Sequence, residues 1–114
     1  MNGFCNERAY KWFLQHLDCA VICRNERQVS EFLEIIGLYG DNRYDNAYQY
    51  AGAGFVYFVP DKSCYSGKYN ICFGSAGLYD NRVRKERPVR FEFPEFRDDI
   101  EGEIPSLMEI LGGI

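Results

Sequence analysis

The sequence has one histidine, one tryptophan and four prolines in 114 residues, and it has no long apolar run. A membrane-spanning helix needs roughly 18 consecutive apolar residues, so we expect no membrane segment. The glycine-rich stretches 52–54 and 74–77 are not followed by a periodic helix. A phosphate-binding loop uses the amides of a helix that begins at the loop, so no nucleotide-binding fingerprint is present.

Cysteine pairs at C-x-x-C spacing are also absent, although the chain has five cysteines: Cys5, Cys19, Cys23, Cys64 and Cys72. An odd number without such pairs matches neither a structural zinc site nor a disulfide framework. Cys19 and Cys23 lie near His16, but on an extended strand four residues separate them by about 13 Å. We predict buried, reduced thiols, no metal and no other cofactor. The first residues lack a secretory pattern, which favours a cytoplasmic location.

No arrangement of nucleophile and base is recognisable in the chain. Cys64 is the thiol best placed on an expected loop, yet it has no flanking signature and only one histidine is available to it. Asp98 and Asp99 are adjacent carboxylates, but they lie in an acidic run where exposure prevents tuning by desolvation. We therefore predict that the protein is not an enzyme.

The composition is that of one folded domain spanning residues 1–114. The chain is 46% hydrophobic and 26% charged, and its length suffices to bury one core. Nine tyrosines, nine phenylalanines and one tryptophan make it 17% aromatic, an excess that is typical of cores and interfaces.

The first third of the chain has clear periodicity. Asn6 is expected to cap a helix over 7–17, in which Tyr10, Phe13, Leu14 and Leu17 form an apolar stripe. The β-branched run 19–23 predicts a buried strand near the centre of a sheet. Asn25 and Gly37 are expected to bound a second helix over 26–36.

Strands predominate in the rest of the chain. Apolar runs predict strands over 55–59 and 69–73, separated by turns at Pro60-Asp61 and Ser66-Gly67. After a loop at 77–81, the alternation over 89–93 predicts a strand with one buried face, and a short helix follows from Ile104. The order indicates an α+β fold: a mainly antiparallel sheet of about four strands, two main helices on one face and a short C-terminal helix.

Residues 38–54 are rich in tyrosine, glycine, asparagine and aspartate, without a period typical of a helix or strand. Tyrosine gives a large amphipathic contact area at little entropic cost, so we predict a binding loop. Its expected contact residues are Tyr39, Tyr44, Tyr48 and Tyr50.

Charge is polarised along the chain. Residues 1–90 hold twelve Lys or Arg against ten Asp or Glu, whereas residues 91–114 hold one against seven. An acidic run contains Asp98, Asp99, Glu101 and Glu103, and a basic run contains Arg82, Arg84, Lys85, Arg87 and Arg90. The runs have two interpretations: they neutralise one another within the molecule, or one of them meets a partner. A basic run beside aromatic residues can also track a nucleic-acid backbone.

The segment Asp18-Cys19-Ala20-Val21-Ile22-Cys23, the helix over 26–36, the Gly/Tyr loop and Cys64-Tyr65 together resemble small accessory proteins of bacteriophages and prophages. The resemblance covers about residues 18–93 and consists of core positions, so no functional residue is carried over. The resemblance implies an accessory protein of a mobile genetic element. Such proteins commonly bind and disable host machinery, and anti-CRISPR proteins are among them. Such a protein would bind a host defence effector in the bacterial cytoplasm.

Three functional hypotheses follow. The first is a non-enzymatic inhibitor that binds a host protein, such as a CRISPR nuclease, through the tyrosine loop and the acidic run. The second is a nucleic-acid- or nucleotide-binding module that uses the basic run. The third is a structural or assembly protein of a phage.

Overall fold

The computed structural model describes residues 6–61, 70–75, 77 and 79–112, with the side chains at 61, 70, 80, 82 and 103–112 excepted. Cys5, Cys64 and the expected turn at Ser66-Gly67 lie outside the described residues. Four strands form one sheet in the order β3-β2-β1-β4: β1 is Cys19–Cys23, β2 is Val56–Asp61, β3 is Asn70–Ser75 and β4 is Val89–Glu92. The α+β prediction is confirmed.

The sheet is mixed. β1 pairs antiparallel with β2, in a register that aligns Val21 with Phe58, and β2 pairs antiparallel with β3. β1 also pairs in parallel with β4, which aligns Val21 with Phe91. All five residues of β1 are buried, as expected for a strand that is covered on both faces.

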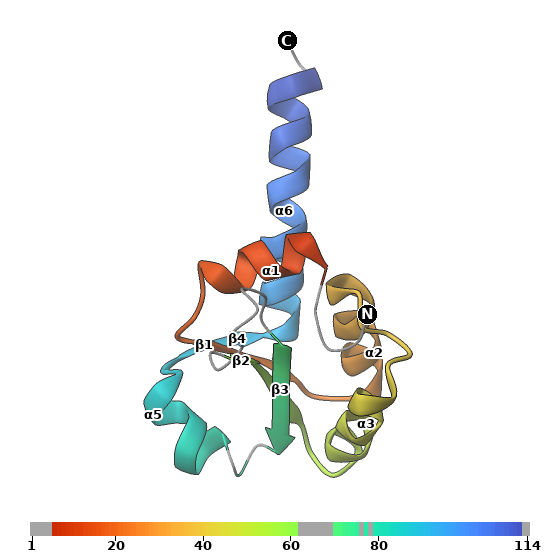
Figure 1. Ribbon diagram of the computed structural model, residues 1–114, viewed down its shortest axis with the longest axis vertical. Coiled ribbons are helices and arrows are strands. Elements are labelled where there is room, and N and C mark those ends of the chain that lie inside the picture. The colour runs from red at the N-terminus through yellow and green to blue at the C-terminus, as the bar shows by residue number, and fades with distance from the viewer. Residues whose placement is uncertain (1–5, 62–69, 76, 78, 113–114) are drawn as a thin grey trace.

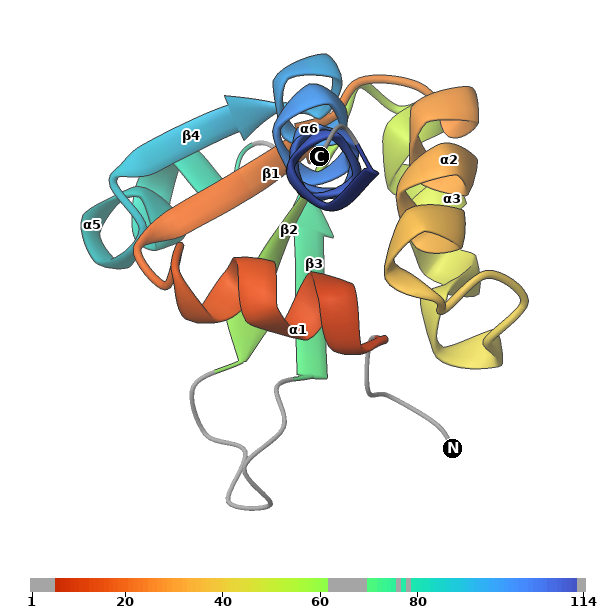
Figure 2. The same cartoon turned by 90° about the horizontal axis from the view of Figure 1, so that it is seen from above.

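Helices cover both faces of the sheet (Figures 1 and 2). On one face lie α1 (Glu7–Leu14), α2 (Glu26–Ile36), the 3-10 turn η1 (Asn42–Tyr44), α3 (Asp45–Gly52) and the start of α6 (Phe93–Gly112). The π-helical turn η2 (Tyr79–Val83) packs on the other face, where Tyr79 and Val83 contact Ala20 and Ile22 of β1, and α5 (Arg84–Glu86) follows it. The expected loop at 77–81 is therefore wrong.

Asn6 holds the ends of two helices together. Its Oδ1 accepts the Ala9 amide at 2.9 Å and caps α1, while its Nδ2 donates to the Ile35 carbonyl of α2 at 2.8 Å. α2 then stops at Gly37, whose φ of 82° is a left-handed conformation that favours glycine. The N-cap at Asn6, the stop at Gly37 and the bounds of α2 confirm the predictions.

Two other helices differ from the expectation. α1 ends at Leu14, and its buried residues are Ala9, Trp12 and Phe13, whereas Leu14 is 41% exposed. α6 begins at Phe93, directly after β4, so the expected short helix from Ile104 is wrong and Phe93 belongs to the helix and not to the strand. Val89 is 43% exposed and burial does not alternate along β4, so the expected strand with one buried face is wrong.

We expect Gly74→Ala to destabilise the protein by about 1–3 kcal/mol, because a methyl group there would overlap the buried ring of Tyr57. Gly102→Ala is the control, since Gly102 lies within α6 and nothing within 4 Å would meet its added methyl group. The control should gain up to about 1 kcal/mol from helix propensity. Denaturant unfolding of the two variants checks both values, and equal stabilities would contradict the packing argument.

Candidate functional site

The tyrosine-rich segment is helical rather than a loop. It contains η1 and α3, and Ala47 and Ala51 of α3 are buried against the core. Asp41 caps η1 by accepting the Arg43 amide at 2.9 Å. Tyr44, Tyr48 and Tyr50 lie in this helical unit, whereas Tyr39 lies in the turn before it.

Tyr44 belongs to the core, so the prediction that it is a surface contact residue is wrong. It is 3% exposed, and its hydroxyl donates to the carbonyl of Ile71 in β3 at 3.0 Å. Burial raises the pKa of Tyr44 to about 12. This hydrogen bond ties the segment to the edge strand of the sheet.

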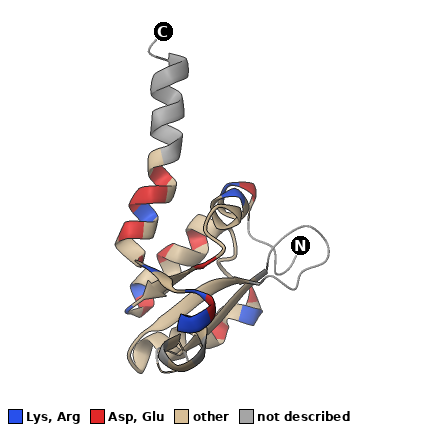
Figure 3. Ribbon diagram, turned by 90° about the vertical axis from the view of Figure 1, so that its left-hand side faces the viewer, with Lys and Arg blue, Asp and Glu red and all other residues tan. Residues whose placement is uncertain are grey.

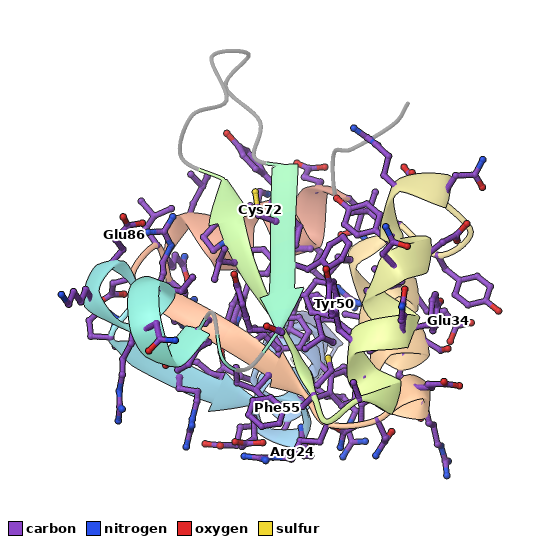
Figure 4. All side chains as sticks on the ribbon, turned by 90° about the horizontal axis from the view of Figure 1, so that it is seen from below. Arg24, Glu34, Tyr50, Phe55, Cys72 and Glu86 are labelled. Carbon is purple, nitrogen blue, oxygen red and sulfur yellow. The ribbon has the colours of Figure 1, made fainter. Side chains whose placement is uncertain are left out.

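The other three tyrosines are accessible to different degrees. Tyr48 is partly buried against the core, whereas Tyr39 is 61% and Tyr50 is 40% exposed. Tyr50 extends from α3 towards β3, where its ring lies 6.0 Å from that of Phe73 (Figure 4). Of the four tyrosines in this segment, Tyr39 and Tyr50 retain large exposed aromatic surfaces.

We expect Tyr44→Phe to lower the free energy of unfolding by about 1–2 kcal/mol, because the Ile71 carbonyl would lose its hydroxyl donor. Tyr39→Ala should change it by no more than about 0.5 kcal/mol. Chemical denaturation measures both, and a neutral Tyr44→Phe would show that water replaces the bond without cost.

The acidic run lies on α6, and Figure 3 shows acidic residues gathered there. Asp98, Asp99 and Glu101 are exposed, as is Glu95 one turn earlier. On the opposite side of the helix, Phe93, Phe96 and Ile100 are buried in the core. The side chain of Glu103 lies outside the described part of the chain.

Asp99 differs from its acidic neighbours because it fastens α6 to α1. Its Oδ2 accepts the indole N–H of Trp12 at 2.6 Å and lies 3.8 Å from Nε2 of His16. The imidazole of His16 stacks on the Trp12 ring with centroids 3.9 Å apart. Trp12 is fully buried and also meets Phe91 and Phe96 edge to face. Asp99 therefore has a structural partner, although its side chain is 47% exposed.

We expect Asp99→Ala to cost about 1–3 kcal/mol of stability, because it leaves the buried indole N–H of Trp12 without an acceptor. Asp98→Ala removes the same charge from the adjacent exposed position and should cost less than about 0.5 kcal/mol. Thermal unfolding followed by tryptophan fluorescence compares the pair. Equal losses would mean that charge, and not this hydrogen bond, is responsible.

The basic run is divided between structural and exposed residues. Arg87 is only 9% exposed, and its Nη2 donates to the Pro60 carbonyl at 3.0 Å. Arg90 lies 3.8 Å from Glu92. Arg84 and Lys85 are exposed on α5, and the side chain of Arg82 is not among those described. The run is thus not a continuous basic arm.

No ion pair joins the acidic and basic runs among the described side chains. Glu92 instead binds Arg24, whose Nε and Nη2 donate to its two oxygens at 2.7 and 2.8 Å. This paired geometry lowers the pKa of Glu92. The Arg24 guanidinium also lies 4.7 Å from the centre of the Phe55 ring (Figure 4). The ends of β1 and β4 are joined by this pair.

The buried thiols are poorly suited to nucleophilic chemistry. Burial raises the pKa of Cys19 to about 12 and raises that of Cys23 well above its ordinary value. The Cys19 thiol donates to the His16 carbonyl at 2.9 Å. No group of three or more metal-binding side chains occurs in the described part of the chain. Across the same residues, no helix is long and apolar enough to span a bilayer.

Three residues that shape the candidate surfaces were missed at the level of sequence. Trp12 falls beside the expected stripe of the first helix, Glu95 falls outside the acidic run, and Arg97 is the single base among the acids. Phe93, Phe96 and Ile100 are spaced by three and four residues, which is typical of a helix. This spacing could have indicated the helix that carries Glu95 and Arg97.

No protein-family model, curated protein or solved structure matches this chain. We therefore infer its function from its own side chains and geometry.

Proposed function

We propose that this chain is a small, non-enzymatic binding protein that inhibits a host defence effector, such as a CRISPR nuclease, in the bacterial cytoplasm. It acts by protein–protein interaction, in the manner of the phage accessory proteins that the sequence resembles. The observation that carries the proposal is the exposed acidic side of α6.

That side of α6 is held in a fixed orientation. The opposite side of the helix is buried through Phe93, Phe96 and Ile100, and Asp99 binds Trp12 of α1. Figure 1 shows α6 extending beyond the sheet and the other helices. Carboxylates that are presented on an ordered helix suit a basic groove of the kind that holds nucleic acid, and such complementarity accelerates association.

Exposed tyrosines supply a second contact. Tyr39 and Tyr50 offer aromatic area of the kind that dominates binding energy at protein interfaces. Burial keeps the thiols of Cys19 and Cys23 protonated near neutral pH, which supports a non-enzymatic role for these two. Cys72 is exposed, so the expectation of buried thiols is wrong for it.

The nucleic-acid-binding alternative is weaker because two of its five basic residues have structural partners. Arg87 binds the Pro60 carbonyl, and Arg90 neighbours Glu92. The described remainder, Arg84 and Lys85, is a small patch on a protein with a net charge of −4. A phage assembly role remains the third hypothesis.

The test is inhibition of DNA cleavage by a panel of purified CRISPR nucleases. We expect the triple variant Glu95→Gln, Asp98→Asn and Glu101→Gln to raise the half-inhibitory concentration by about tenfold or more, with slower association as the cause. The wild-type effect should weaken between low and physiological salt, because the Debye length falls to about 8 Å.

The matched control is Glu7→Gln, Glu34→Gln and Asp45→Asn, which removes three exposed acids from α1, α2 and α3 and changes the net charge equally. It should inhibit like the wild type. Failure to inhibit any nuclease would reject the inhibitor proposal, and equal potency of both triple variants would reject the acidic side of α6 as the contact. A shift of free DNA by the protein alone would favour the nucleic-acid alternative.

A further inference from the structure

A polar hollow of about 340 Å³ lies between the first turns of α2 and α6. Figure 2 shows these two helices side by side on the same face of the sheet. The hollow is next to the carboxyl ends of the parallel strands β1 and β4, because α2 follows β1 after two residues and α6 follows β4 at once. Its walls are Asn25, Arg27, Gln28, Glu31, Phe93 and Arg97.

The side chains around the hollow present hydrogen-bond donors. The Asn25 Oδ1 accepts the Gln28 amide at 2.9 Å, and the Gln28 Oε1 accepts the Arg24 amide at 2.8 Å. Both amide oxygens are thus committed to backbone N–H groups. The two side-chain NH₂ groups have no acceptor among the described residues.

Two arginines add further donors and positive charge. The Arg27 Nε is 3.3 Å from Glu31 Oε1, and the Arg97 Nη1 is 3.8 Å from Glu31 Oε2. The Arg97 Nε also lies 3.5 Å from Oδ1 of Asp98, which is not part of the wall. None of these contacts is the paired, short geometry that Arg24 makes with Glu92, so each guanidinium keeps N–H groups for another acceptor. Glu31 is the only acid in the wall and is shared by two cations.

We propose that this hollow binds a phosphate-type oxyanion. Four donor side chains from α2 and α6 face a space that is large enough for a phosphate group, and the field of two helix N-termini adds to their attraction. Glu31 competes with the ligand for both arginines. This site lies on other residues than the acidic side of α6 and does not depend on the proposed inhibition.

The test is a titration of the full chain with inorganic phosphate at constant ionic strength, followed by amide NMR. We expect saturable shifts at residues 25–28 and 97. Arg97→Gln should weaken the binding by about fivefold or more, because it removes a charged, multidentate donor. Glu31→Gln should strengthen the binding by about threefold or more, because it removes the carboxylate in the wall that competes for both arginines.

Arg84→Gln is the matched control, since it removes an equal charge from the exposed surface of α5 and should leave the affinity unchanged. Melting curves confirm that each variant is folded. Adenosine monophosphate in a parallel titration distinguishes free phosphate from a nucleotide: equal affinity assigns free phosphate, and tighter binding assigns a nucleotide. Shifts that do not saturate, that are the same in Arg97→Gln, or that weaken in Glu31→Gln would overturn the proposal, as would equal affinity for acetate.

Discussion

The burial of β1 on both faces is the constraint on which the rest of the structure depends. Cys19, Val21 and Cys23 contribute to the larger core cluster, and Ala20 and Ile22 contribute to the smaller one. A strand of five apolar residues must be covered twice, so the chain needs helices above the sheet and the η2 turn below it. β1 is also the only strand in the described sheet that pairs both in parallel and antiparallel.

Most of the regular elements near β1 could be predicted because their signals are local. The cap at Asn25, the stop at Gly37 and the β-branched run of β1 involve residues only a few positions apart. The tyrosine segment was misread because alanines, not large apolar residues, face the core in α3. The burial of Tyr44 depends on Ile71, which is 27 residues away, so no local pattern could indicate it.

The candidate site was predictable in part for the same reason. The acidic run is exposed as expected at Asp98, Asp99 and Glu101, but the helix that carries it was not predicted, and Asp99 is also bound to Trp12, 87 residues earlier in the chain. Likewise, the basic run includes Arg87, whose acceptor is the Pro60 carbonyl of β2. A run of like charge in the sequence therefore overstates the charged surface that is open to a partner, because some of its side chains bind other parts of the same molecule.

The periodicity of α6 gives this helix three distinct faces. Phe93, Phe96 and Ile100 bind it to the core, Asp98 and Glu101 face away, and Arg97 lies between them at the hollow beside α2. The acidic face and the face at the hollow adjoin, since the Arg97 Nε lies 3.5 Å from the Asp98 Oδ1. Because the buried face of α6 is packed against the core, the orientation of its acidic face and of its face at the hollow is set at the same time. The hydrogen bond between Trp12 and Asp99 adds to this anchoring, although neither residue belongs to the two proposed binding surfaces.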